Sequence, residues 1–199
     1  MYFLKLVGGL VNSPHKLIVR YRDNKKYVPA LLIVIITALL VIPLMFIPVS
    51  IPGSGVNLKQ AISGFFINFF VVIATYPLAC LVLKLASLIR KKKVTFMEIF
   101  STWGFSYVPS AIFLLYILLT HLFIPKGKPI IGTTPLSIIL VTLLVAIFIW
   151  KLLFYFIELR IVLHENFGGI IISSLIIIFF FAAYYLLVAY LLGYKVPVL

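Results

Sequence analysis

The chain has 199 residues, of which 64% are hydrophobic and 11% are charged, and its mean hydropathy is +1.27. An average soluble domain is about 45–50% apolar and about 25% charged. Seventeen basic and four acidic residues are too few to cover the surface of a soluble protein of this size. The composition therefore excludes a soluble globular domain, a disordered chain and a disulfide-stapled secreted module. It indicates an integral membrane protein.

Five apolar windows are long enough to cross the hydrocarbon core of a bilayer, which takes about 20 helical residues. These windows cover residues 28–50, 61–89, 105–124, 135–157 and 169–193. Prolines in the first window predict a kinked or unwound outer end, and Pro77 is expected to bend the second. Because the connections are short, the sequence predicts a single all-α membrane domain over residues 1–199. Residues 1–27 form its N-terminal cytoplasmic or interfacial segment.

The basic residues predict the orientation. If the N-terminus is placed in the cytoplasm, 13 of the 17 basic residues lie on the cytoplasmic side. The four that then lie outside are Lys59, Lys126, Lys128 and Lys195. Short loops rich in Lys and Arg face the cytoplasm. We therefore expect a cytoplasmic N-terminus and an extracytoplasmic C-terminus.

Two short interfacial helices are predicted outside the spans. Residues 2–11 place their apolar side chains on one helical face, and Ser13 followed by Pro14 is a helix start signal. This segment is expected to lie in the membrane interface, with a poorly ordered tail as the alternative. Between the second and third spans, Thr95 and Glu98 have capping-box spacing. A second short helix is therefore expected to begin just after Thr95, on the cytoplasmic surface.

The entry of the third span into the membrane carries three special residues, Gly104, Tyr107 and Pro109. Pro109 frees the carbonyl of Phe105, which must find a partner in hydrocarbon. Gly104 lets a neighbouring helix approach closely. We therefore expect this segment to pack against another span, in the first place the second span at Tyr76-Pro77, and not to face lipid.

Side chains that catalyse reactions or hold metals do not form a recognisable site. His164 and Glu165 begin like a zinc-protease helix, but Gly168 stands where that motif needs its second histidine. The three histidines fall on different segments, so they are not expected to share one metal. The sequence predicts no catalytic residues, no metal site and no cofactor, and the protein is not expected to be an enzyme.

The fourth predicted span contains a possible intramembrane polar pair, Lys151 and Glu158. Together with Tyr155 they share one helical face. Ionisable groups at membrane depth can mark an ion path. The other interpretation is structural: Lys151 extends to the cytoplasmic boundary and Glu158 sits in the interface.

A basic run, Arg90, Lys91, Lys92 and Lys93, follows the second predicted span. Such a run sets topology, and it also attracts anionic lipid headgroups at about 1 kcal/mol per residue near the surface. The net charge of +13 is therefore assigned to the membrane and not to a nucleic acid.

Short motifs occur in a characteristic order across nearly the whole chain. They are Leu10-Val-Asn-Ser-Pro14-His-Lys16, the basic run, Val94-Thr-Phe-Met-Glu98-Ile-Phe100, Gly104-Phe-Ser-Tyr107-Val-Pro109, Trp150 and Glu158-Leu-Arg160. This order resembles the Yip family (Ypt-interacting proteins) in its short prokaryotic form. The resemblance implies five spans, a cytoplasmic N-terminus and no catalytic residues. It also implies an accessory membrane protein, in some members linked to ABC-type export systems.

Together these features predict a non-enzymatic polytopic scaffold or accessory protein of a prokaryotic cytoplasmic membrane. An ABC-type export system or a membrane-organising role is the setting that the resemblance implies. Its expected partners are anionic headgroups and a membrane-protein partner or a second copy of itself. The alternative is a small oligomeric transporter or channel.

Overall fold

The structure, a computed structural model, describes residues 6, 8–10, 12–47, 57–123 and 135–192. The described residues form helices and short connections, without a β-strand. The helices are α2 (Pro14–Asn24), α3 (Val28–Leu39), α4 (Val41–Phe46), α5 (Leu58–Ile89), α6 (Phe96–Thr102), the 3₁₀ helix η2 (Trp103–Tyr107), α7 (Val108–Phe123), α8 (Pro135–Ile161) and α9 (Phe167–Leu192). Residues 48–56 and the predicted outer loop with Lys126 and Lys128 lie outside the described residues, as do Lys195 and most of residues 2–11.

The described part of the chain contains four helical segments long and apolar enough to cross a membrane. They are Leu58–Ile89, Phe96–Thr120, Val141–Ile161 and Phe167–Leu191. A fifth is reached only if Pro14–Asn24 and Val28–Leu44, which meet at an angle of 116°, are counted as one bent span. The membrane-protein class and the all-α fold are thus confirmed. The count of five spans stays a prediction, because Val28–Leu44 qualifies only when it is joined to the sharply bent Pro14–Asn24.

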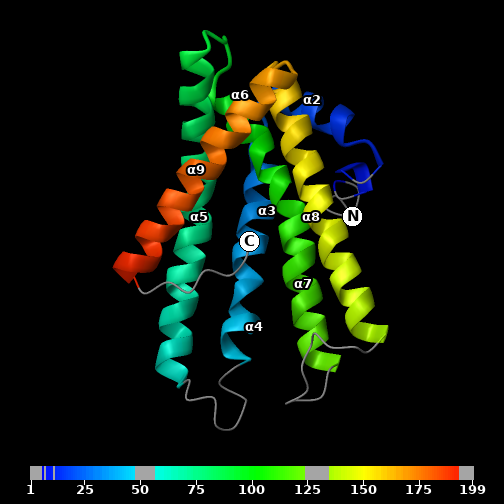
Figure 1. The fold of residues 1–199 in the computed structure, drawn as a ribbon, viewed down its shortest axis with the longest axis vertical. Coiled ribbons are helices and arrows are strands. Elements are labelled where there is room, and N and C mark those ends of the chain that lie inside the picture. The colour runs from blue at the N-terminus through cyan, green and yellow to red at the C-terminus, as the bar shows by residue number, and fades with distance from the viewer. Residues whose placement is uncertain (1–5, 7, 11, 48–56, 124–134, 193–199) are drawn as a thin grey trace.

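Helices α3–α4, α5, α7 and α8 run roughly side by side along the long axis of the molecule, and α2 lies across one end (Figure 1). The α3–α4 pair packs against α5, and α7 packs against α3 and α8. From the loop that joins it to α8, α9 slants across the bundle and packs along α5 (Figure 1). Half of the apolar window in α5 is buried inside the protein, compared with 11% in α8 and 18% in α9. The outer faces of α8 and α9 are therefore the main apolar surface that faces the surroundings.

Local sequence signals explain how α5 begins and continues. Its N-cap, Asn57, accepts from the backbone N–H of Gln60, and the Gln60 side chain accepts from the N–H of Asn57, which completes a capping box. Pro77 lies inside the helix, which continues through it to Ile89. Tyr76 is 1% exposed, and its hydroxyl donates to the carbonyl of Phe100 in α6. This bond ties the middle of α5 to the helix that precedes the third predicted span.

The helix start at Pro14 is confirmed, with Ser13 as the N-cap residue, although the Ser13 side chain makes no capping hydrogen bond. The apolar face of α2 is buried against α6 and α8. Ile18 is fully buried, and the ring of Tyr21 meets Phe105 edge-on at 5.2 Å. The interfacial position of α2 stays a prediction, since its buried face is covered by protein.

The segment from α6 to α7 follows the sequence prediction closely. Thr95 caps α6 and Glu98 completes the capping box, so the helix begins at Phe96 as expected. At the membrane entry the backbone tightens into η2, and the carbonyl of Phe105 accepts from the N–H of Val108. A 3₁₀ turn thereby satisfies the carbonyl that Pro109 deprives of its usual donor. A carbonyl that a proline leaves without its usual donor needs a local partner of this kind inside a membrane.

Tyr107 and Gly104 turn toward two different helices. The ring of Tyr107 meets that of Tyr76 edge-on at 6.2 Å, which confirms packing against the second predicted span. Gly104, by contrast, lies against α3: a Cβ atom built on it would be 2.5 Å from the carbonyl oxygen of Ala30. The first predicted span is therefore the close neighbour of Gly104, a contact that the sequence prediction had assigned to the second.

Candidate functional site

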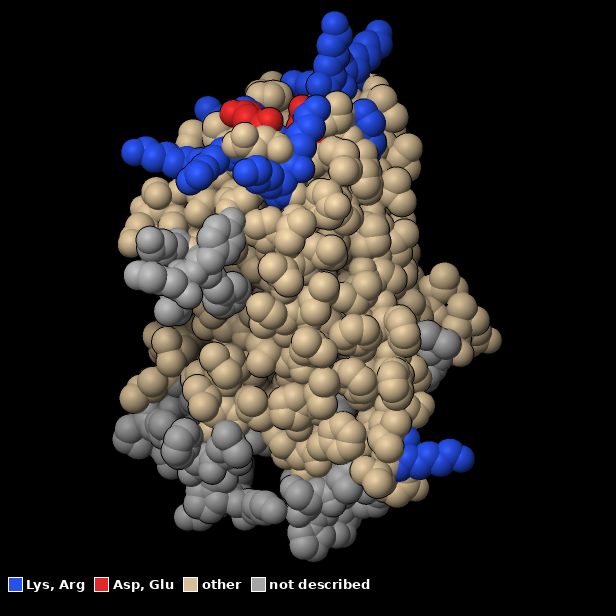
Figure 2. All heavy atoms as spheres, turned by 180° about the vertical axis from the view of Figure 1, so that it is seen from behind, with Lys and Arg blue, Asp and Glu red and all other residues tan. Residues whose placement is uncertain are grey.

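Two regions bring charged and polar side chains together: a basic end of the bundle and a cavity between the helices. The basic end is formed by α2 and by the residues that follow α5 and precede α6, with the end of α8. Its basic residues are Lys16, Arg20, Arg22, Lys25, Lys26, Arg90, Lys91, Lys92, Lys93 and Arg160. Figure 2 shows Lys and Arg gathered at this end, with one basic side chain at the opposite end of that face. Lys59, at the start of α5, is the described basic residue of the opposite end.

Several basic side chains tie the basic end into one surface by bonding to the end of α8 and the loop after it. Arg22 donates to the carbonyl of Ile161 at 2.8 Å, and Lys92 donates to the carbonyl of His164 at 2.9 Å. Cations near the last carbonyls of a helix are favourable because the helix dipole is negative there. Segments far apart in the sequence are thereby fixed to one another.

A buried ion pair lies next to these bonds. Arg90 Nη1 is 2.9 Å from Glu165 Oε2, and the Glu165 side chain is 1% exposed. Gly169, in the first turn of α9, faces both side chains so closely that a Cβ atom would collide with them. Its N–H donates to the side chain of Asn166. The ion pair joins the end of α5 to the α8–α9 connection, a contact that the sequence analysis did not predict.

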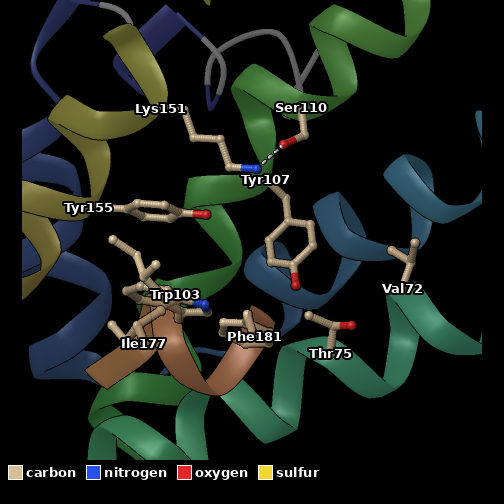
Figure 3. Close-up of a pocket in the computed structure, with 10 residues that line it drawn as sticks. Val72, Thr75, Trp103, Tyr107, Ser110, Lys151, Tyr155, Ile177 and Phe181 are labelled. Atoms are coloured by element: carbon tan, nitrogen blue, oxygen red, sulfur yellow. Dashed lines mark hydrogen bonds between the residues drawn. The ribbon is translucent and has the colours of Figure 1, made fainter. Parts of the chain in front are cut away.

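The second region is a cavity of about 180 Å³ between α5, η2, α7, α8 and α9. Its lining residues are Val72, Thr75, Trp103, Tyr107, Ser110, Lys151, Tyr155, Ile177, Ile178 and Phe181. Lys151 is the one charged residue among them. Its Nζ donates to the hydroxyl of Ser110 at 2.8 Å (Figure 3).

Aromatic rings shape the cavity around the ammonium group. The ring of Tyr155 lies with its centroid 5.8 Å from Lys151 Nζ, within the range of a cation–π contact. Tyr155 stacks on Trp103, with ring centroids 5.2 Å apart and an interplanar angle of 2°. Figure 3 shows the Tyr155 hydroxyl and the Trp103 indole nitrogen pointing toward the middle of the cavity. With the hydroxyls of Thr75, Tyr107 and Ser110, these groups form a polar patch in the lining, and the remaining lining residues are apolar.

Lys151 and Glu158 do not form an ion pair, although both are described. Lys151 bonds to Ser110, whereas Glu158 is 2% exposed and lies beside Leu83 and Ile99. Lys151 also lies nine residues before Arg160 in α8, roughly 14 Å along the helix axis. It therefore lies within the bundle and does not extend to the basic end.

The other predicted residues have structural positions. Pro14 begins α2, Thr95 and Glu98 cap α6, and Pro109 is buried at the start of α7. Trp150 is half-buried and its ring lies 5.9 Å from that of Phe154, outside the cavity lining. The sequence analysis missed Ser110 as the hydrogen-bond partner of Lys151, and Trp103 as the ring that stacks on Tyr155. The available signal for Ser110 was a lone hydroxyl directly after Pro109.

No acidic or metal-ligating cluster was predicted, and the described residues contain no group of three or more His, Cys, Asp and Glu side chains arranged to hold a metal.

Comparisons with protein-family models, with curated proteins and with solved structures found no match. The resemblance to the Yip family therefore stays a prediction from the sequence motifs.

Proposed function

We propose that the protein is a non-enzymatic multi-pass scaffold or accessory protein of a prokaryotic cell membrane. In this proposal the basic end holds anionic lipid headgroups at the cytoplasmic surface. The observation that supports it is the basic end itself, where the basic side chains gather and long-range bonds fix their supporting segments. A surface whose backbone segments are already held in place loses less conformational entropy when it binds headgroups.

The orientation follows from the same charges. The positive-inside bias favours a cytoplasmic basic end, with Lys59 on the opposite side. A reporter inserted next to Lys92 should therefore be cytoplasmic, and one fused after Leu199 should be extracytoplasmic. A cytoplasmic reporter after Leu199 would contradict the five-span topology, and with it the count of α3–α4 as a crossing.

The lipid part of the proposal is tested by thermal unfolding of the purified protein in detergent with added phosphatidylglycerol or phosphatidylcholine. Ligands that bind the folded state raise its stability. The test variant replaces four exposed basic residues that make no side-chain hydrogen bond in the described part of the chain, each by Gln: Lys16, Arg20, Lys91 and Lys93.

Phosphatidylglycerol should raise the unfolding temperature of the wild type more than phosphatidylcholine does, and the fourfold variant should lose that difference. Lys59→Gln, at the opposite end, is the matched control and should keep it. An equal response to both lipids in the wild type would refute headgroup binding at the basic end.

The alternative, a small oligomeric transporter or channel, is favoured by one observation, the cavity beside Lys151. The two functions differ in which molecules should co-purify with the protein. Purification in a mild detergent should yield a stoichiometric membrane-protein partner if the protein is an accessory subunit. A self-oligomer that moves solute across reconstituted vesicles would instead establish transport.

A further inference from the structure

The cavity around Lys151 lies at a depth where a positive charge is costly. Removing an ammonium group from water into a low-dielectric interior carries a large free-energy penalty unless an anion or several hydrogen bonds compensate it. An ammonium has three donors. Within the described part of the chain, Lys151 Nζ has one hydrogen bond, to Ser110, and a ring contact with Tyr155. None of the ten lining residues is acidic. The site thus presents a cation and spare donors to the volume that these residues line.

The shape of the lining indicates what that volume accepts. Around the polar patch lie Val72, Ile177 and Phe181, and Ile178 is 61% exposed on the outer surface of α9. The cavity therefore reaches the apolar surface of the bundle at Ile178. A ligand that combines one negative charge with an apolar chain fits both parts of the lining.

We propose that this cavity binds a carboxylate, with Lys151 as its charge partner and the apolar chain leaving past Ile178. One cation is matched by one negative charge. A carboxylate stands at the tip of its chain, so that its charge can reach Lys151 while the chain leaves on one side, past Ile178. A phosphodiester has substituents on both sides, and both would have to leave. This proposal goes beyond the scaffold function and does not depend on it.

A carboxylate can come from the bilayer, as a fatty acid, or from water, as a small organic acid. The experiment uses three probes against the purified full-length protein in detergent: palmitate, the uncharged hexadecanol of equal chain length, and acetate. Binding is measured as the rise of the unfolding temperature with probe concentration. Palmitate should stabilise the protein and hexadecanol should not, because the chain alone leaves Lys151 uncompensated.

The acetate arm identifies the source. If palmitate stabilises the protein and acetate does not, the ligand comes from the bilayer. Stabilisation by acetate that also depends on Lys151 assigns it to water, and the carboxylate site holds in both cases. Stabilisation by neither carboxylate, or by hexadecanol as strongly as by palmitate, would overturn the proposal.

Lys151→Met keeps an unbranched apolar stem as long as that of lysine and removes the charged group at its end. It should weaken palmitate binding roughly tenfold or more, since a charge-assisted hydrogen bond is worth at least about that factor. Lys59→Met, at the other end of the bundle, is the control and should bind as the wild type does. Unchanged palmitate binding by Lys151→Met would refute the assignment of Lys151.

A second measurement keeps the test decisive if Lys151→Met does not fold. The sequence contains two tryptophans, and Trp103 lines the cavity whereas Trp150 does not. In Trp150→Phe protein, the fluorescence of Trp103 should be quenched by a stearate that carries a nitroxide near its carboxyl end. Excess palmitate should reverse this quenching, and hexadecanol should not. Quenching that palmitate leaves unchanged would place the fatty acid elsewhere and overturn the proposal.

Discussion

Gly104 offers the sharpest test of how the membrane entry is packed. A Cβ atom at this position would lie 2.5 Å from the carbonyl oxygen of Ala30, 2.7 Å from its carbonyl carbon and 2.8 Å from its Cβ. Ordinary contacts to a Cβ atom begin at about 3.4 Å. Two of the three atoms are backbone, so relief requires α3 to move away from η2 by several tenths of an ångström or more. No side-chain rotation can substitute for that shift.

The expected cost of Gly104→Ala is that of overpacking a well-filled interface, about 1–3 kcal/mol. For a chain of this size each kcal/mol corresponds to roughly 2–4 °C, so the unfolding temperature should fall by several degrees. Gly104→Leu should cost more. The assay is thermal unfolding of the purified protein in detergent, with Gly168→Ala as control, because no atom lies within 4 Å of a Cβ built there.

A double variant examines the mechanism. Ala30→Gly removes the contact at 2.8 Å but leaves the carbonyl at 2.5 Å, so it should recover only part of the stability that Gly104→Ala loses. If Gly104→Ala unfolds at the same temperature as Gly168→Ala, the close approach of η2 to α3 is wrong. The reasoning on the packing of the membrane entry would then fail as well.

Three further predictions concern the ends of the helices. Thr95→Ala removes the side-chain acceptor at the start of α6 and should lower stability by about 0.5–2 kcal/mol in thermal unfolding, whereas Thr142→Ala, at an exposed position within α8, should change little. Arg90→Met leaves the buried Glu165 carboxylate unpaired and should lower the free energy of unfolding by up to about 3–5 kcal/mol. The loss should be smaller than that limit because the Arg90 side chain is 24% exposed, so that water already screens part of the ion pair. Adding Glu165→Gln to that variant should restore stability, and a double variant no more stable than the single one would contradict the ion pair. Gly169→Ala should destabilise because the ends of the Arg90 and Glu165 side chains must move to admit its methyl group, which weakens their ion pair; an unchanged unfolding temperature in the same assay would show that they move without that loss and would contradict this prediction.

Features that depend on neighbours in the sequence were predictable. The capping box of α6 involves Thr95 and Glu98, three residues apart, and its geometry is set by the first turn of the helix. The start of α2 at Pro14 follows from the fixed φ of proline, and the apolar windows follow from the length of helix that a bilayer requires. The need of the Phe105 carbonyl for a partner also follows from the sequence, because Pro109 lacks an N–H group.

Features that depend on which helices meet were decided by the tertiary structure. Gly104 indicates that some helix comes close, but small residues do not specify their partner, and the packing places α3 there. Lys151 and Glu158 share a helical face in the sequence, yet they meet different neighbours of α8. Lys151 donates a hydrogen bond to Ser110, whereas Glu158 is buried beside Leu83 and Ile99. Contacts of this kind join residues dozens of positions apart, since they depend on how whole helices pack and not on the three- and four-residue periodicity that the sequence displays.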